Sequence, residues 1–362
     1  MAVMKQVMKQ WRAAIVFAIV LMVSVACAVT QAPTPTTPVS PQGNSQHQSS
    51  PPIAAPRSVQ VPGKTPPPKV DAERLFRHIQ ALNFERYRDR DRSRTRAYLL
   101  QTLTHLGWQP QLQRFEGGIN VVAQRAGTDP KAGTILVAAH FDTVKGSPGA
   151  DDNASSIATA LEIARLLGQS QTPRALQVAL FDAEETGLLG SFAFTANAAN
   201  LVNLAGVVNL EMLGYACRTA GCQKYPAGLP ITPPTDRGDF LGVIGDQEHL
   251  PLLDAFVPSS SADDSANLPP VVTLPIPFKG VLTPDVLRSD HAPFWARNIG
   301  AVMVGDTANF RNPHYHQPSD TPETLDRTFL TGSAQRVINA VTQLLNSHDP
   351  LTTIDSTTAT SS

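Results

Sequence analysis

An uninterrupted apolar run, TILVAAH at residues 134–140, most strongly constrains how this chain can fold. A run of this length without alternating polar residues is typical of a strand buried on both faces of a sheet. Apolar residues then recur at helical spacing over 157–167, and two further apolar runs follow at 175–183 and 204–213, with a helical segment between them at 187–198. Strands that alternate with helices in this way predict an α/β fold, with a central mixed, mostly parallel sheet flanked by helices on both faces.

The remaining segments add elements of both kinds. Helices are expected at 72–82, at 94–106 with Ser93 as the N-cap, and at 325–345. Further short strands are expected at 109–116, 119–125, 240–245, 271–277 and 301–307. The sequence shows no internal repeat, and 362 residues at 42% hydrophobic composition are enough to bury the core of one large domain.

The N-terminal residues have the composition of an export signal. Basic residues precede an apolar run at 13–23, which is shorter than the about 20 residues that a membrane-spanning helix needs. The sequence SVAC at 24–27 resembles a bacterial lipobox, although Ser24 replaces the usual leucine-like residue, so both lipidation of Cys27 and plain secretion stay open. We therefore expect an exported protein, periplasmic or extracellular, either free or attached to a membrane through Cys27.

Composition divides the chain into four parts. They are a signal peptide at 1–27, a disordered Pro/Thr/Ser-rich tether at 28–69, one folded domain at 70–346 and a disordered tail at 347–362. The formal net charge of −1 gives no reason to expect nucleic acid or an anionic membrane surface as a partner.

Two cysteines lie close together in YACRTAGCQKYP. In an exported protein a local disulfide between Cys217 and Cys222 is expected, because a zinc site would need two further soft ligands that the sequence does not supply. Two buried thiols are the alternative.

Acids and histidines follow the predicted strands where each strand ends. They are His140 and Asp142, Asp151 and Asp152, Glu184 and Glu185, Glu211, and the segment from Arg311 to Thr321. Ligands of open α/β sheets bind beyond the carboxyl ends of the strands, so these side chains should converge. Carboxylates held close together repel one another unless a cation lies between them. The sequence therefore predicts a metal site at this edge of the sheet.

The same residue types indicate what such a site could do. His140 and Asp142 are two apart on an extended segment and share a face, so one can bind metal while the other holds its imidazole. A carboxylate has two oxygens and can bridge two ions, and a pair of divalent ions can activate water and polarise a carbonyl. Of the adjacent acids Glu184 and Glu185, one could bind metal while the other acts as general base.

Six motifs occur in the order of a known family. AHFDTV, PGADDNASS, FDAEETGLLGS, NLEMLGY, SDHAPF and NPHYHQPSDT, within roughly residues 70–345, resemble the signature of the co-catalytic zinc aminopeptidases, a family that includes bacterial leucyl aminopeptidases, glutamate carboxypeptidases and glutaminyl cyclases. The resemblance implies a zinc exopeptidase-like domain that binds two zinc ions. It implies that His140 and Glu211 hold one zinc and that Glu185 and His316 hold the other.

The resemblance also assigns the residues between and beside the ions. It implies that Asp152 bridges the two zinc ions, that Glu184 is the general base and that Asp142 orients His140. Glu211 departs from the aspartate that many members have, which leaves the second zinc less firmly implied than the fold.

Four neighbouring residues receive other roles. Asp151 is expected to cap the following helix, and His314 to be a packed or surface neighbour. Asp290 and His291 are expected to support the pocket or contact substrate.

We therefore expect a metal-dependent exopeptidase. The activity that we favour is that of an aminopeptidase that acts on peptides. A glutaminyl cyclase that forms N-terminal pyroglutamate on the same fold is the alternative. A carboxypeptidase is disfavoured because no pocket for a substrate carboxylate is identifiable. A non-catalytic binding module is disfavoured because no ligand or base is missing.

Overall fold

The computed structural model describes residues 67–227, 229, 234–257 and 268–353. The chain separates into Met1–Gly63 and Lys64–Ser362, and every described residue belongs to the second unit. The predicted signal peptide, most of the predicted tether and Cys27 lie outside the described residues. Among the described helices, none is long and apolar enough to cross a membrane.

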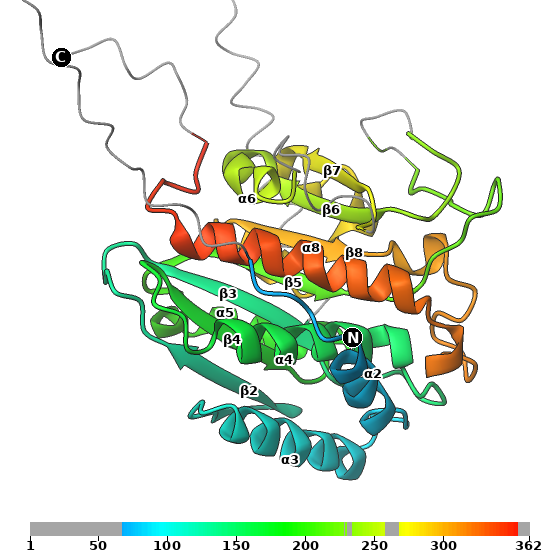
Figure 1. Cartoon of the computed structure of the whole chain (residues 1–362), viewed down its shortest axis with the longest axis horizontal. Helices are drawn as coiled ribbons and strands as arrows, with labels where there is room; N and C mark the ends of the chain where they lie inside the picture. The colour runs from blue at the N-terminus through cyan, green and yellow to red at the C-terminus, as the bar shows by residue number, and fades with distance from the viewer. Residues whose placement is uncertain (1–66, 228, 230–233, 258–267, 354–362) are drawn as a thin grey trace, which may run out of the picture. The chain divides into compact units, whose positions relative to one another are not determined.

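The domain is built on an eight-stranded sheet with the order β1-β2-β4-β3-β5-β8-β6-β7 (Figure 1). The strands are β1 (Gln111–Phe115), β2 (Gly118–Arg125), β3 (Thr134–His140), β4 (Ala175–Phe181), β5 (Leu204–Glu211), β6 (Leu241–Asp246), β7 (Val271–Ile276) and β8 (Ala301–Gly305). The central strands β4, β3, β5 and β8 run parallel, while β2 and β6 each pair antiparallel with the outermost of these. The predicted mixed, mostly parallel sheet is confirmed.

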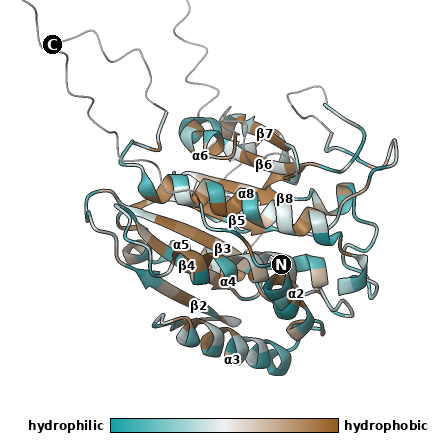
Figure 2. Cartoon of the chain, in the orientation of Figure 1, coloured by the Kyte–Doolittle hydropathy of each residue, from teal (hydrophilic) through white to brown (hydrophobic). Residues whose placement is uncertain are grey.

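The apolar run at 134–140 forms β3, and all of its residues are buried. The run lacks polar alternation because both of its faces are covered. Ile135, Val137 and Ala139 point into one core, and Leu136 and Ala138 point into a second core on the opposite face. Figure 2 shows the central strands in the brown of apolar residues.

Helices cover both faces of the sheet. They are α2 (Ala72–Ala81), α3 (Asp89–His105), α4 (Ser156–Leu167), α5 (Leu189–Ala196), α6 (Leu250–Asp254), α7 (Ala292–Trp295) and α8 (Arg327–Asn346). The core that contains Ile135 is covered by α2, α4 and α8, which lie in front of the sheet in Figure 1. The other core is closed by Phe194 of α5 and Trp295 of α7.

Two predictions about the ends of elements are wrong. The second helix, α3, begins at Asp89 rather than Arg94, and Ser93 lies inside it, where its hydroxyl accepts a hydrogen bond from Arg96 at 2.5 Å. Acidic residues in the first turn of this helix, Asp89 and Asp91, complement the positive end of the helix dipole and favour the earlier start.

The chain also stays packed beyond residue 346, where a disordered tail was expected to begin. Leu351 is buried, and Thr353 donates a hydrogen bond to the carbonyl of Gln247 at 3.0 Å. A single apolar side chain that reaches the core five residues after the predicted end of the domain carries no periodic signal, which explains the error. The rest of the predicted tail lies outside the described residues.

Candidate metal centre

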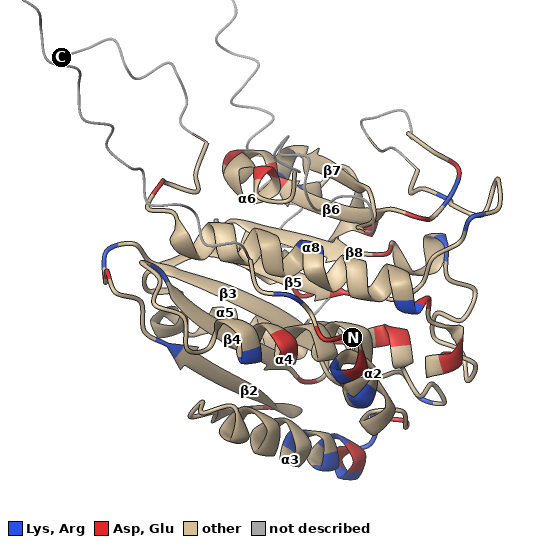
Figure 3. Ribbon diagram, in the orientation of Figure 1, with Lys and Arg blue, Asp and Glu red and all other residues tan. Residues whose placement is uncertain are grey.

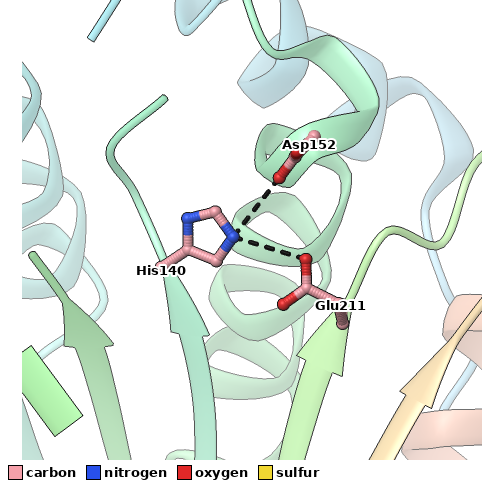
Figure 4. A group of neighbouring side chains, drawn as sticks. All are labelled: His140, Asp152 and Glu211. Carbon is pink, nitrogen blue, oxygen red and sulfur yellow. Dashed lines mark hydrogen bonds and ion pairs between the residues drawn. The ribbon is translucent and has the colours of Figure 1, made fainter. Parts of the chain in front are cut away.

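Two groups of metal-ligating side chains lie at the carboxyl edge of the parallel strands and share Asp152. One consists of His140, Asp152 and Glu211, and the other of Asp152, Glu185 and His316. The Nε2 atom of His140 lies 3.3 Å from Asp152 Oδ1 and 3.4 Å from Glu211 Oε1 (Figure 4). The Nε2 atom of His316 lies 3.1 Å from Asp152 Oδ2 and 3.1 Å from Glu185 Oε2. The two oxygens of Asp152 therefore face different histidines.

The sheet explains why these residues meet. His140 is the last residue of β3 and Glu211 is the last residue of β5, and these strands are parallel neighbours. Glu185 follows β4, and His316 follows β8. Asn153 ties the Asp152 loop to the end of β5, since its side chain donates to the carbonyl of Leu210 and accepts from the amide of Met212. In Figure 3 the central strands carry little charge along their length, and acidic residues lie beyond the carboxyl end of β3.

Several ligand atoms of these groups have no other partner. Asp152 Oδ1, Glu185 Oε1 and His316 Nε2 are buried, and none of them makes a hydrogen bond of acceptable geometry within the described part of the chain. Buried polar atoms are rarely left in this condition. Their convergence, and the mixture of imidazole and carboxylate donors, fit a divalent cation such as zinc.

The electrostatics of the cluster also favour positive charge. Burial alone would lower the pKa of His140, but the carboxylates, led by that of Glu211, hold it well above its ordinary value. Burial likewise opposes the charge on His316, yet Asp152 and Glu185 raise its pKa to about 10. Burial and the nearby Asp152 carboxylate raise the pKa of Glu185 to about 7. The acids draw protons onto the site, as expected of a cluster whose charge a bound cation would balance.

Glu184 belongs to neither ligand group. The residue is 8% exposed, and burial raises the pKa of its carboxyl group well above the ordinary value, which suits a group that takes up a proton. Asp142 connects it to the centre, because its carboxylate accepts from the amides of Glu184 and Glu185 at 3.0 and 3.2 Å. The Oδ1 atom of Asp142 also lies 3.6 Å from His140 Nδ1, in the position that an orienting carboxylate would take.

Asp151 does not cap a helix, so that prediction is wrong. Its carboxylate accepts from the amide of Gly214 and from the side chain of Asn312, each at 2.8 Å, and α4 has no side-chain cap. These partners are distant in the sequence, so the local pattern could not reveal them. His314 lies outside both ligand groups, as predicted, with its Nδ1 atom 2.9 Å from Ser319 Oγ.

Asp290 and His291 are fully buried, and neither lines the pocket beside the centre. His291 donates from Nε2 to the carbonyl of Val286 at 2.7 Å. These positions agree with a supporting role and give no sign of contact with a substrate.

Sequence reasoning missed a hydrogen-bond chain that holds Glu211. Asn209 donates to Ser289 Oγ at 2.8 Å, and the Ser289 hydroxyl donates to Glu211 Oε2 at 2.5 Å. Ser289 is the first residue of the SDHAPF motif. Its position in that motif is the sequence signal that could have identified it as a functional residue. A second missed contact joins Arg288 to the hydroxyl of Tyr315, the residue before His316, at 3.1 Å.

An apolar pocket of about 140 Å³ opens beside Glu211. Its floor comes from β6, β7 and β8 through Ile244, Leu274 and Met303, and aromatic side chains at Tyr225 and Phe240 line its wall. The predicted disulfide between Cys217 and Cys222 is present in the segment that leads to Tyr225.

A third group of Asp246, Glu248 and His249 has ligating atoms close together. The ammonium group of Lys279 pairs with two of these acids. Its Nζ atom lies 2.7 Å from Glu248 Oε2 and 3.9 Å from Asp246 Oδ1. This arrangement is an ion-pair network at the opposite edge of the sheet from His140, because Asp246 ends β6, which runs antiparallel to β8.

Comparison with known proteins identifies relatives of part of this chain. The model of peptidase family M28 matches residues 120–231. An uncharacterized protein of Escherichia coli, YfbL, is 33% identical over 241 residues, which are 63% of this chain and 71% of that protein. The probable lipoprotein aminopeptidase LpqL of Mycobacterium tuberculosis is 30% identical over 236 residues, and this chain spans only 44% of its length.

Solved structures share the fold at low sequence identity. The aminopeptidase of Aneurinibacillus sp. strain AM-1 superposes with a TM-score of 0.58 at 17% identity, over 75% of this chain and 93% of that one. A Bacteroides thetaiotaomicron glutaminyl cyclase bound to N-acetylhistamine gives 0.53 at 16% identity, over 76% and 98%. The family model at residues 120–231 and the 33% identity to YfbL, 71% of which this chain covers, show that this chain belongs to peptidase family M28.

Proposed function

We propose that this protein is an exported, zinc-dependent aminopeptidase that removes N-terminal residues from peptides. The observation that carries the proposal is the geometry of Asp152, whose two oxygens face two separate histidine-and-carboxylate groups beside a buried acid, Glu184, that is not a ligand. His140, Asp152 and Glu211 would hold one zinc ion, and Asp152, Glu185 and His316 the second. The named aminopeptidase among its relatives supports the same activity.

When bound, the ions would polarise the scissile carbonyl and make a water molecule more acidic. Glu184 accepts a proton from the attacking water on its carboxylate and returns it to the nitrogen of the leaving amine. Its burial fits this task, because burial raises the pKa of the Glu184 carboxyl group and so makes its carboxylate a stronger base toward the attacking water. Asp142 fixes the position of the Glu184 backbone relative to the His140 ring, because its carboxylate contacts both.

The surroundings favour a substrate amine over a substrate carboxylate. Arg288 is the one cation among the described residues that line the pocket, and it already donates to Tyr315 and Asn309. The apolar floor beside Glu211 would accept an apolar side chain of the first residue.

A glutaminyl cyclase is the second candidate, because a solved cyclase shares the fold. Cyclisation needs no attacking water and leaves the peptide at full length. A hydrolase that uses Glu184 as described must shorten the peptide by one residue. The products therefore separate the two functions.

The test is mass spectrometry of three peptides after incubation with the zinc-loaded protein. A peptide that begins with Leu should lose that residue, and its N-acetylated form should stay intact because the amine is blocked. A peptide that begins with Gln should release Gln. If the Gln peptide instead loses ammonia and keeps its length while the Leu peptide is untouched, the protein is a cyclase.

Export and anchoring are separate parts of the proposal. They rest on the basic and apolar composition of residues 1–27 and on the SVAC sequence that ends at Cys27. Fractionation of bacterial cells that express the full chain should find it outside the cytoplasm. A Cys27→Ala variant should lose membrane association if Cys27 is lipidated, and an unchanged distribution between membrane and soluble fractions would reject lipidation.

A further inference from the structure

Arg86 is a fully enclosed cationic residue near the metal centre. Its side chain is fully buried, although it comes from ERYRDRDRSR, a segment in which most residues are exposed. Among the described residues no carboxylate forms an ion pair with it. Its guanidinium instead donates to backbone carbonyls, which is a costly way to bury a charge unless the contacts serve a purpose.

Three of these carbonyls belong to the segments that carry two members of the first metal-ligand group, His140 and Asp152. Arg86 Nε donates to the carbonyl of Phe141, which lies between His140 and Asp142, at 2.7 Å. Its Nη1 and Nη2 atoms donate to the carbonyls of Pro148 and Gly149 at 2.6 and 2.8 Å, at the start of the loop that presents Asp152.

Further contacts fix Arg86 itself. Its Nη1 atom also donates to the carbonyls of Leu82 and Phe84, which follow α2, and its own amide donates to Thr143 Oγ1 at 2.9 Å. One rigid guanidinium thus ties the end of β3, the Asp152 loop and the segment after α2 to one another.

The backbone at Gly149 is shaped to admit this side chain. Gly149 has φ +63°, and a Cβ atom there would lie 2.7 Å from Arg86 Nη2 and 2.3 Å from the carbonyl oxygen of Asp152. A glycine is therefore required where the Asp152 loop passes the guanidinium.

Arg86 also supplies positive charge behind the acids. Burial lowers its pKa to about 10, and Asp320, Asp152 and Asp142 oppose that shift, so the guanidinium stays protonated at neutral pH. Asp320 holds the other side of the same loop, because its carboxylate accepts from the amides of Asp151 and Asp152 at 2.8 and 3.0 Å.

We propose that Arg86 is a positioning residue of the metal centre, which sets the separation of His140 and Asp152 by binding the carbonyls of the segments that carry them. The inference rests on the proposed metal centre. The inference goes beyond the proposed metal centre because it assigns the spacing of two ligands to a residue that touches neither metal nor substrate.

The test is the zinc affinity of Arg86→Lys, measured by competition with a chromophoric chelator. Lysine keeps the charge but has three donors on one atom and cannot reach carbonyls on three segments. Residues that orient metal ligands typically change metal affinity by 10–100-fold, so the dissociation constant for zinc should rise by about that factor. The wild-type protein must bind zinc for the comparison to be made; if it does not, the proposed function fails, and not only the role of Arg86.

Arg174 offers a matched control at the other end of the sheet. Its side chain is also buried, and it donates to the carbonyls of Ala132, Leu344 and Asp349. Arg174→Lys should lower the melting temperature by an amount comparable to Arg86→Lys while its zinc affinity stays within about 2-fold of wild type. Equal zinc affinities for folded Arg86→Lys and wild type, or an equal loss in Arg174→Lys, would overturn the proposal.

A second pair of variants covers the case in which Arg86→Lys does not fold. Thr143→Val removes the hydroxyl that accepts from the Arg86 amide at nearly constant size, and Thr143→Ser keeps a hydroxyl there. Zinc affinity should fall in Thr143→Val and return in Thr143→Ser. Unchanged affinity in a folded Thr143→Val protein would contradict a positioning role for Arg86.

Discussion

His291 should make the folded domain lose stability in mild acid. The ring is fully buried, its Nε2 atom donates to the carbonyl of Val286 at 2.7 Å, and Nδ1 has no partner among the described residues. Burial lowers its pKa to about 4, although Val286 and Asp246 pull in the other direction. The folded protein therefore holds the neutral ring, whereas the unfolded chain protonates it near the ordinary value of about 6.5.

The sign and size of the effect follow from this difference. Between pH 6.5 and 4 the unfolded state binds the extra proton, so the contribution of His291 is complete above pH 6.5 and is lost as the pH falls toward 4. At about 1.4 kcal/mol for each tenfold change in proton affinity, the full loss is roughly 3 kcal/mol. Below pH 4 both states are protonated, and this contribution becomes flat.

Urea unfolding of metal-free protein at pH 7, 6, 5 and 4.5 measures the effect. The free energy of unfolding of wild type should fall more steeply with acidity than that of His291→Gln, which cannot take up the proton. His105→Gln, at an exposed position, is the matched control and should follow the wild-type slope. Identical slopes for wild type and His291→Gln would refute the reasoning.

The metal centre and the domain boundary give three further predictions. Asp152→Ala should lose metal and activity together, because Asp152 lies in both ligand groups; full activity with wild-type metal content would remove its bridging role. Glu185→Gln should weaken metal binding first, and an excess of zinc should restore part of the activity; a titration that leaves the variant inactive at saturating zinc would instead assign Glu185 to the chemistry. Deleting residues 1–66 should leave a soluble, active domain, because described contacts begin at Pro68, whose carbonyl accepts from Gln335 at 3.0 Å; failure of the truncated chain to fold would show that the boundary is misplaced.

The sequence predicts those parts of the fold that depend on local patterns. The run at 134–140 identified β3 because burial on both faces leaves no polar alternation. The rule that ligands gather at the carboxyl ends of parallel strands then brought His140 and Glu211 together, since these residues end two neighbouring strands. The prediction needed no knowledge of side-chain contacts.

Features set by distant contacts could not be predicted in this way. Asp151 was expected to cap a helix, but Gly214 and Asn312, far along the chain, bind its carboxylate. Arg86 lies in a charged segment whose composition is typical of a solvated helix start, and its burial depends on carbonyls more than 50 residues away. The apolar pocket also escaped prediction, because its lining comes from three strands and several loops that meet only in the folded domain.

The most direct test of the proposed chemistry is Glu184→Gln, with metal content and turnover measured on the same preparation. The amide is nearly the size of the acid and Glu184 lies outside both ligand groups, so zinc content should equal that of wild type. Turnover of a peptide that begins with Leu should fall by at least about 10²–10⁴-fold, the usual contribution of a general base. Wild-type turnover in the zinc-loaded variant would contradict the proton-transfer role of Glu184, and loss of zinc would contradict its placement outside the ligand set.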